Sequence, residues 1–205
     1  SLERANESRR EMEAVNVKLL KQSETDQMTG LANRYRLNDY SDKVLDYCYE
    51  HRLPLAMEIL DIDFFKQYND NYGHQQGDEC IIAIANELKK MEDGQTFCAR
   101  YGGDEFIIIY AGISAEEVHA KAGALRQNIM NLKLEHLYSN ALPIVTISQG
   151  ISYGVPEEGN RSWDFLHTAD MLLYQVKKRS RNDICIADIR GQELDLSSKQ
   201  EKVEP

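Results

Sequence analysis

The chain has 205 residues, of which 42% are hydrophobic and 28% are charged, which suits one globular domain with additional length at its ends. The formal net charge of −10 argues against non-specific binding to nucleic acid or to an anionic membrane surface, because both require a basic face. No apolar run approaches the roughly 20 residues of a membrane-spanning helix, so we expect no direct membrane contact by this chain.

The chain begins with serine rather than methionine, and we expect it to be a fragment of a longer protein whose missing part lies upstream. Its four cysteines are scattered, with no CxxC spacing, at Cys48, Cys80, Cys98 and Cys185. This pattern predicts buried free thiols in a reducing compartment rather than disulfides or a zinc site. We therefore expect a cytoplasmic location, which leaves open a membrane anchor upstream in the full-length protein.

Residues 1–25 are charged, contain no glycine or proline, and predict a linker helix. Positions spaced alternately by three and four form a weak heptad seam, at Ala5, Ser8, Met12, Val15, Leu19 and Gln22. Two interpretations stay open. The segment is either a solvated linker helix or the end of a parallel coiled coil that joins two copies to an upstream sensor.

Residues 26–187 predict one domain. Helices are predicted over 34–51, where the pattern stops before Pro54, and over 77–90, 114–132 and 162–178, the last with Ser162 as its N-cap. Strands are predicted over 55–62, 144–151 and 183–187, with a hairpin over 96–110 that turns at Gly102 and Gly103. Residues 188–205 are polar and predict a flexible tail.

Strands and helices alternate irregularly, and the hairpin must pair antiparallel. The expected fold class is therefore α/β (α+β), a mixed sheet with helices packed against it rather than a regular barrel.

Two acidic stretches need a functional explanation. In RYGGDEF, residues 100–106, the turn requires glycine but does not require the adjacent acids Asp104 and Glu105. In LDIDFFK, residues 60–66, the alternation of a strand places Asp61 and Asp63 on one face, ~7 Å apart. Solvated acids at a strand end are the simpler alternative. If the two strand ends are adjacent, however, Asp61, Asp104 and Glu105 form a cluster of hard oxygen ligands suited to Mg²⁺.

Basic residues occur where a bound phosphate would need them. Lys66 follows the aspartates, and Lys177 and Arg181 lie four positions apart, so they share one face if the last helix continues that far. Basic residues at a helix end are also common as complements of the helix dipole. Asn69 and Asp78 are further polar candidates, because an amide and a carboxylate match the edge of guanine.

Several motifs in this order resemble the GGDEF-domain family of diguanylate cyclases, namely DQMTGLANR, LDIDFFKQYNDNYGHQQGD, RYGGDEF and ADMLLYQVKKRSRND. The resemblance covers about Asp26 to Ile186. It implies a central mixed, largely antiparallel sheet of about five strands wrapped by helices, similar to the nucleotide-cyclase and polymerase palm. It also implies that two GTP condense to cyclic di-GMP with release of two pyrophosphates, in a homodimer whose active site closes when two domains face each other.

The resemblance also implies roles for individual residues. The implied metal ligands, for Mg²⁺ or Mn²⁺ with two ions per site, are Asp61, the backbone carbonyl of Ile62, Asp104 and Glu105. Implied catalytic residues are Glu105, Asp104 and Lys66, with Glu105 either contacting metal or activating the attacking 3′-hydroxyl. Implied substrate-binding groups are the backbone amides of Phe64 and Phe65, the charges of Lys66, Lys177 and Arg181, and the guanine readers Asn69 and Asp78.

The sequence departs from the family pattern at two informative places. Ser180 occupies the glycine of a GRN motif, where serine would be strained if the position needs a positive φ. Many members carry an Arg-x-x-Asp motif at which product binds and inhibits, and here the matching residues read DGQT, with Asp93 and Thr96 in the two places. We therefore expect no product inhibition through this site.

Three other functions compete with cyclic di-GMP synthesis, and one of them, a plain structural interaction domain, leaves the packed acids unexplained. The main alternative is a catalytically degenerate GTP-binding domain that regulates a partner, although the signature keeps all of its acids. A cyclase for adenine or mixed dinucleotides is disfavoured by Asp78, because a carboxylate accepts protons from guanine N1 and N2, whereas adenine N1 carries none.

Overall fold

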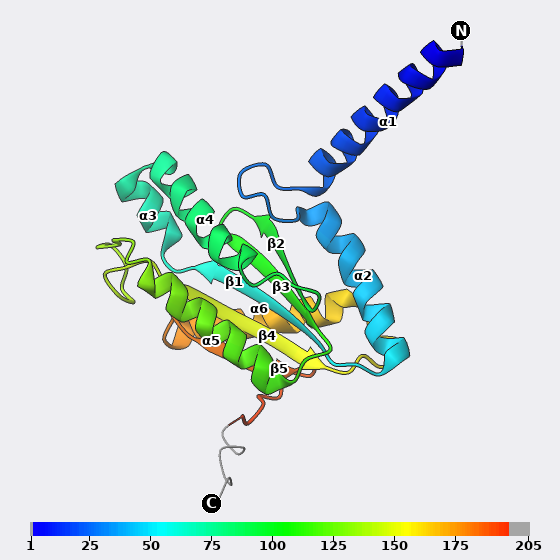
Figure 1. Ribbon diagram of the computed structural model, residues 1–205. Coiled ribbons are helices and arrows are strands. Elements are labelled where there is room, and N and C mark those ends of the chain that lie inside the picture. The colour runs from blue at the N-terminus through cyan, green and yellow to red at the C-terminus, as the bar shows by residue number, and fades with distance from the viewer. Residues whose placement is uncertain (1, 197–205) are drawn as a thin grey trace, which may run out of the picture.

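The computed structural model describes residues 2–196, apart from the side chains of residues 21 and 22, and has a five-stranded sheet between helices (Figure 1). The strands are β1 (Leu55–Ile62), β2 (Thr96–Gly102), β3 (Glu105–Ala111), β4 (Ile147–Gly154) and β5 (Ile184–Asp188). Their order is β2-β3-β1-β4-β5, and every neighbouring pair is antiparallel except β4 and β5. The predicted mixed, largely antiparallel sheet is confirmed.

The helices are α1 (Leu2–Glu24), α2 (Arg34–His51), α3 (Phe65–Tyr72), α4 (His74–Lys89), α5 (Ala115–Asn131) and α6 (Ser162–Arg179). Buried side chains of α4 and α5 pack with one set of strand residues, and those of α2 and α6 pack with the other set. Because helices cover both of its faces, all eight residues of β1 are buried, which explains its continuous apolar sequence.

Several predicted bounds agree with the structure, and others need correction. The helix at 34–51 and the strand at 55–62 have the predicted bounds. The helix predicted from residue 77 begins at His74 and is preceded by a separate α3, because Gly73 at φ +89 breaks the two helices apart.

Strand β4 begins three residues later than predicted, since Ile144 pairs with Glu135 in an isolated bridge. Arg161, not Ser162, is the N-cap of α6, and its N–H donates to the Asp164 carboxylate.

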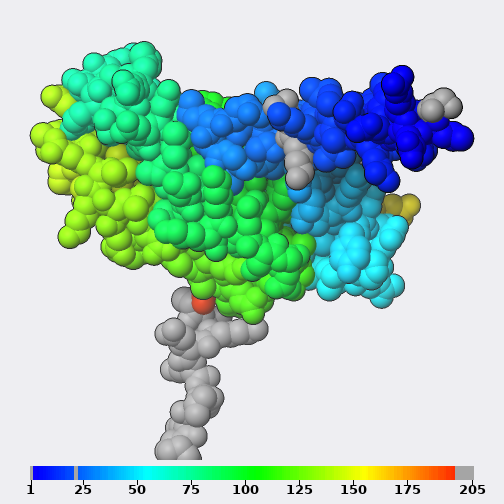
Figure 2. Space-filling view, turned by 45° about the horizontal axis from the view of Figure 1, so that its top comes forward, coloured from blue at the N-terminus to red at the C-terminus, as the bar shows by residue number. Residues whose placement is uncertain are grey.

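The two ends of the described chain behave differently. Helix α1 projects away from the domain, with Met12, Val15 and Leu19 of the predicted seam exposed (Figures 1 and 2). The side chain of Gln22 lies outside the described residues. We expected a flexible tail from Asp188 onward, but Leu194 donates its N–H to the Ile186 carbonyl, and its side chain packs against the core. Residues 197–205 of that expected tail lie outside the described part.

The four cysteines are free and buried, as predicted. Among residues 2–196, no helix combines the length and the apolar character that crossing a membrane requires.

Candidate active site

The candidate site lies where β1 ends and the β2–β3 hairpin turns back. Asp61, near the end of β1, is the direct cross-strand neighbour of Glu105, the first residue of β3. Asp104 precedes Glu105 in the turn and interacts with the Asp61 carboxyl through both charge and a hydrogen bond. The convergence expected from the sequence is therefore present: Asp61, Asp104 and Glu105 lie together.

Arg100 holds the turn that carries these acids. Gly103 adopts φ +50, a conformation that favours glycine, and its carbonyl accepts hydrogen bonds from Nη2 of Arg100 at 2.8 Å and from Nε at 3.1 Å. The same guanidinium lies 3.4 Å from the Asp26 carboxylate, in the segment that follows α1. One arginine thus ties the acidic turn to the segment that connects α1 to the domain.

Crowding of the acids changes their ionisation. Burial, followed by repulsion from Asp104, raises the pKa of Asp61 to about 7, and Lys177 offsets part of the rise. Burial and the charge of Asp61 also raise the pKa of Glu105, again against an opposing effect of Lys177. Raised carboxyl pKa values in a cluster favour a cation or a proton between the oxygens.

The two basic residues near the end of α6 each contact one of the two aspartates near the end of β1, Asp61 or Asp63. Lys177 is an ion-pair and hydrogen-bond partner of Asp61. Arg181 lies 3.7 Å from Oδ1 of Asp63, and its guanidinium carbon lies 4.1 Å from the centre of the Phe64 ring. The condition under which they would share one helix face is not met, because α6 ends at Arg179 and Arg181 has φ +52.

Ser180 carries no left-handed strain. Its φ is −142°, and the positive φ values fall on Arg181 and Asn182 instead. The strain considered for serine at this position of the motif is therefore absent from the structure.

Asp63 has a different role from Asp61, although the strand alternation placed them on one face. It is fully buried and accepts hydrogen bonds from the hydroxyls of Thr146 at 2.7 Å and Ser148 at 2.6 Å, and from the N–H of Asn182 at 3.0 Å. Thr146 precedes β4, Ser148 lies in β4, and Asn182 lies in the connection between α6 and β5. Asp63 therefore fastens the site to the sheet, and the interpretation of it as a solvated acid is wrong.

The turn between β1 and α3 presents backbone N–H groups. Phe64, at φ +54, precedes α3, and the first helical hydrogen bond is donated by Tyr68 to the Phe64 carbonyl. The N–H groups of the first helical residues, including Phe65 and Lys66, consequently have no partner within the helix. The Lys66 side chain is exposed and lies 3.8 Å from Asp70, so it does not contact the acidic cluster.

Asn69 and Asp78 come from the two helices of the α3–α4 pair. Oδ1 of Asn69 is buried and has no hydrogen-bond partner among the described residues. A Cβ on Gly77 would lie 1.8 Å from this oxygen, so only glycine permits the contact that brings Asn69 beside the residue preceding Asp78. Asp78 itself is exposed. A buried amide oxygen without a donor beside an exposed carboxylate suits a ligand that supplies N–H groups.

The acids fit a divalent cation, provided that other oxygens complete its shell. Within residues 2–196, no three His, Cys, Asp or Glu side chains are placed to hold a metal ion by themselves. Magnesium is commonly held by one or two carboxylates together with water and substrate phosphate, so Asp61 with Asp104 or Glu105 is a sufficient protein contribution. The Ile62 carbonyl belongs to the next residue of β1 and could add a backbone oxygen.

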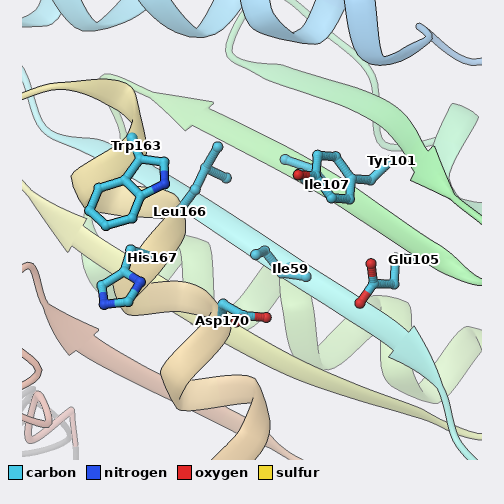
Figure 3. Close-up of a pocket in the computed structure, with 8 residues that line it drawn as sticks. All are labelled: Ile59, Tyr101, Glu105, Ile107, Trp163, Leu166, His167 and Asp170. Carbon is cyan, nitrogen blue, oxygen red and sulfur yellow. The ribbon is translucent and has the colours of Figure 1, made fainter.

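A cavity of about 240 Å³ opens beside Glu105, between α6 and the sheet (Figure 3). Ile59 and Ile107 form its floor, and Glu105 and Asp170 face one another across β1. The charge of Asp170 is a further cause of the raised pKa of Glu105. The side chain of Glu105 is therefore accessible from the face that carries α6.

Sequence reasoning assigned no role to three residues that shape the site. Arg34, at the start of α2, lies with its guanidinium carbon 4.1 Å from the centre of the Tyr101 ring, and its charge offsets a small part of the rise in the pKa of Glu105. Arg100 and Asp63 hold the turn and the strand end, as described above. Each lies in a motif quoted from the sequence (DQMTGLANR, LDIDFFK or RYGGDEF), but nothing local indicates the contacts that it makes.

A family model and individual relatives of known sequence point to the same family. The family described as "Diguanylate cyclase, GGDEF domain" matches residues 23–183. The chain is 35% identical over 163 residues to "Probable diguanylate cyclase DgcC" of Escherichia coli strain K12, covering 78% of this chain and 42% of that protein. It is 32% identical over 190 residues to "Diguanylate cyclase DgcP" of Pseudomonas aeruginosa, covering 91% of this chain and 28% of that protein. The chain thus spans less than half the length of these relatives.

A solved structure supports the same conclusion for the fold. The coiled coil and GGDEF domain of DgcB from Caulobacter crescentus, in complex with c-di-GMP, superimposes with a TM-score of 0.80 at 29% identity. The match covers 90% of this chain and 97% of that chain.

Proposed function

The chain belongs to the GGDEF family of diguanylate cyclases, and on that premise we propose that it condenses two GTP into cyclic di-GMP with release of two pyrophosphates. The observation that carries the proposal is the contact between the end of β1 and the signature turn, which raises the pKa of Asp61 to about 7 through burial and repulsion from Asp104. A fold without a cation or phosphate ligand to bind gains nothing from this repulsion.

Each proposed half-site binds one GTP through groups already placed for it. The guanine edge donates to Asn69, whose buried oxygen lacks a partner among the described residues, and to the exposed carboxylate of Asp78. The triphosphate lies at the N–H groups of Phe64 and Phe65, with Lys177 and Arg181 supplying positive charge. Lys66 would have to leave Asp70 to reach a phosphate, which its exposed side chain permits.

The proposed chemistry is an in-line attack by a 3′-hydroxyl on the α-phosphorus of the other nucleotide. Glu105 accepts the hydroxyl proton, since burial and the charge of Asp61 raise its pKa and make it a stronger base, and pyrophosphate leaves with its charge stabilised by the basic residues. Asp61, the Ile62 carbonyl, Asp104 and Glu105 would hold one or two Mg²⁺ or Mn²⁺ ions. When bound, these ions neutralise phosphate charge and lower the cost of deprotonating the hydroxyl.

Catalysis requires a homodimer, because nucleophile and electrophile arrive on different subunits. The exposed apolar side chains of α1 support a role for this helix in setting how two domains face each other. We propose that a sensor upstream in a longer protein acts through α1, and that the domain works in the cytoplasm, where four free thiols remain reduced.

The direct test is incubation of the 205-residue chain with GTP and Mg²⁺, followed by mass analysis of the nucleotides, with Glu105→Gln as the control. Cyclic di-GMP formed by the wild type and lost in the control supports the proposal. GTP binding without product at high protein concentration would support the alternative of a degenerate regulatory domain. Mixed ATP and GTP in the same assay tests the choice of base.

A further inference from the structure

His136 contacts the β1–α3 turn from a distant part of the chain. It lies in the loop between α5 and β4 and is fully buried. Its Nε2 is 3.0 Å from the carbonyl oxygen of Phe64. Because a carbonyl oxygen can only accept, Nε2 must carry the proton and donate this hydrogen bond. His136 itself is held by its own N–H, which donates to the Pro143 carbonyl at 3.0 Å.

The residue that His136 contacts has an unusual backbone conformation. Phe64 has φ +54, which costs about 1–3 kcal/mol for a non-glycine residue unless its surroundings enforce it. Its carbonyl accepts from both His136 and the N–H of Tyr68, and its ring lies under the guanidinium of Arg181. The peptide that follows Phe64 is therefore fixed at its oxygen by His136, and its N–H belongs to Phe65, one of the proposed phosphate-binding groups.

Packing alone does not account for an imidazole at this position. The ring lies edge-on to Tyr68, with centres 5.2 Å apart, and near Tyr72. Its Nδ1 is buried without a hydrogen-bond partner in the part of the chain that the structure describes. A buried nitrogen without a partner costs free energy, so a phenylalanine would fill the same aromatic site at lower cost. What histidine adds is the hydrogen bond to Phe64.

We infer that His136 is a positioning residue for the phosphate-binding turn, which it acts on through the Phe64 carbonyl without touching substrate. The inference rests on the proposed function, since it assigns a task to the turn in binding the GTP triphosphate. It gives the loop before β4 a role in substrate affinity, although that loop contributes none of the site residues expected from the sequence.

The test compares three variants of the 205-residue chain by equilibrium binding in Mg²⁺. The ligands are the α,β-methylene analogue of GTP, which cannot release pyrophosphate, and guanosine, which has no phosphate. His136→Gln places an amide N–H where Nε2 stands, His136→Asn carries the same amide one bond too short, and His136→Phe keeps the ring without the donor. Thermal unfolding of each variant checks that it folds.

We expect His136→Phe and His136→Asn to lose roughly five- to tenfold in affinity for the GTP analogue, the size of one hydrogen bond. We expect His136→Gln to stay within about twofold of the wild type, and guanosine affinity to stay unchanged in all three. If His136 only fills space, the affinities for the GTP analogue should have the opposite order, with His136→Phe binding more tightly than His136→Gln. If His136→Phe does not fold, tighter binding of the GTP analogue by His136→Gln than by His136→Asn supports the role of His136, and equal binding overturns it.

Two failures can be told apart. Equal binding of the GTP analogue by wild type and folded variants, or equal losses for the analogue and guanosine, would overturn the role of His136 alone. A wild-type chain that binds neither ligand would overturn the proposed function and this inference with it.

Discussion

The Lys177 ammonium donates a hydrogen bond to Oδ2 of Asp61, which ties the last turn of α6 to the end of β1 across 116 positions of the chain. Lys177 is also the group that limits the rise in the pKa of Asp61 to about 7. This contact therefore opposes the effects of burial and of Asp104, and favours the charged form of Asp61 that a metal ion needs.

Replacing Lys177 by methionine should lower diguanylate cyclase activity at pH 7 by at least about tenfold. Without the ammonium, the pKa of Asp61 rises further, and each unit of pKa reduces its ionised fraction about tenfold at a pH below the pKa. The acidic limb of the pH–rate profile should accordingly move to higher pH. Lys178→Met is the matched control, because Lys178 is exposed and lies over Tyr174. An unshifted acidic limb would contradict the assignment.

Replacing Arg100 by lysine should lower kcat by roughly tenfold with little change in KM. Lysine cannot form the fork that holds the Gly103 carbonyl, so the turn that carries Asp104 and Glu105 is no longer fixed. Steady-state kinetics measure the effect, and Arg179→Lys, which changes an exposed ion pair with Asp183, serves as the control. Equal kcat values for Arg100→Lys and the wild type would show that the turn holds its shape without the fork.

Cyclic di-GMP should not inhibit through the family's usual product site. Lys121 lies 3.2 Å from Asp93 and 3.0 Å from the Thr96 hydroxyl, so the two positions are paired within the chain and offer no arginine for a phosphate. The initial rate should stay constant as cyclic di-GMP is added. Inhibition at micromolar product that disappears in Asp93→Ala would place a product site here after all.

Stability should fall as the pH rises from about 5 to 8 because of Glu58. Burial raises the pKa of this carboxyl from 4.5 to about 8, and Tyr110 donates a hydrogen bond to it at 2.7 Å. In that window the folded chain binds more protons than the unfolded chain, so the free energy of unfolding falls with pH by at most about 1.4 kcal/mol per unit. Below the window this contribution is fully present, and above pH 8 it is lost.

The Glu58→Gln variant removes this titration, so its free energy of unfolding should decline less between pH 5 and 8. Urea unfolding at pH 5, 7 and 9 measures the difference from the wild type, with Glu79→Gln at an exposed position of α4 as the control. Parallel pH dependences for Glu58→Gln and the wild type would refute the assignment.

The sequence was sufficient to predict those elements whose local pattern agrees with their packing in the fold. Helix α2 and strand β1 have the predicted bounds, because Pro54 separates them and an apolar run fills a strand buried on both faces. The proximity of Asp61, Asp104 and Glu105 was also predictable, on the condition that the two strand ends are adjacent, because a glycine turn does not by itself require two acids.

The remaining features depend on long-range contacts that leave no local pattern. Asp63 resembles Asp61 in its sequence context. It is buried, however, and accepts hydrogen bonds from the hydroxyls of Thr146 and Ser148, which lie 83 and 85 positions later in the chain. His136 lies in the irregular loop between α5 and β4, and its contact with Phe64, 72 positions earlier, appears only in the folded chain. The end of α6 at Arg179 follows from the left-handed conformations of Arg181 and Asn182, which the basic sequence did not indicate.

The most direct measurement is the affinity for Mn²⁺, by electron paramagnetic resonance, in the presence of the α,β-methylene analogue of GTP. We compare the wild type with Asp61→Asn and with Asp46→Asn, an exposed control on α2. If the strand end and the signature turn share a divalent ion, Asp61→Asn should weaken Mn²⁺ binding at least about tenfold while the control stays within twofold. Mn²⁺ affinity unchanged by Asp61→Asn would contradict the shared metal site.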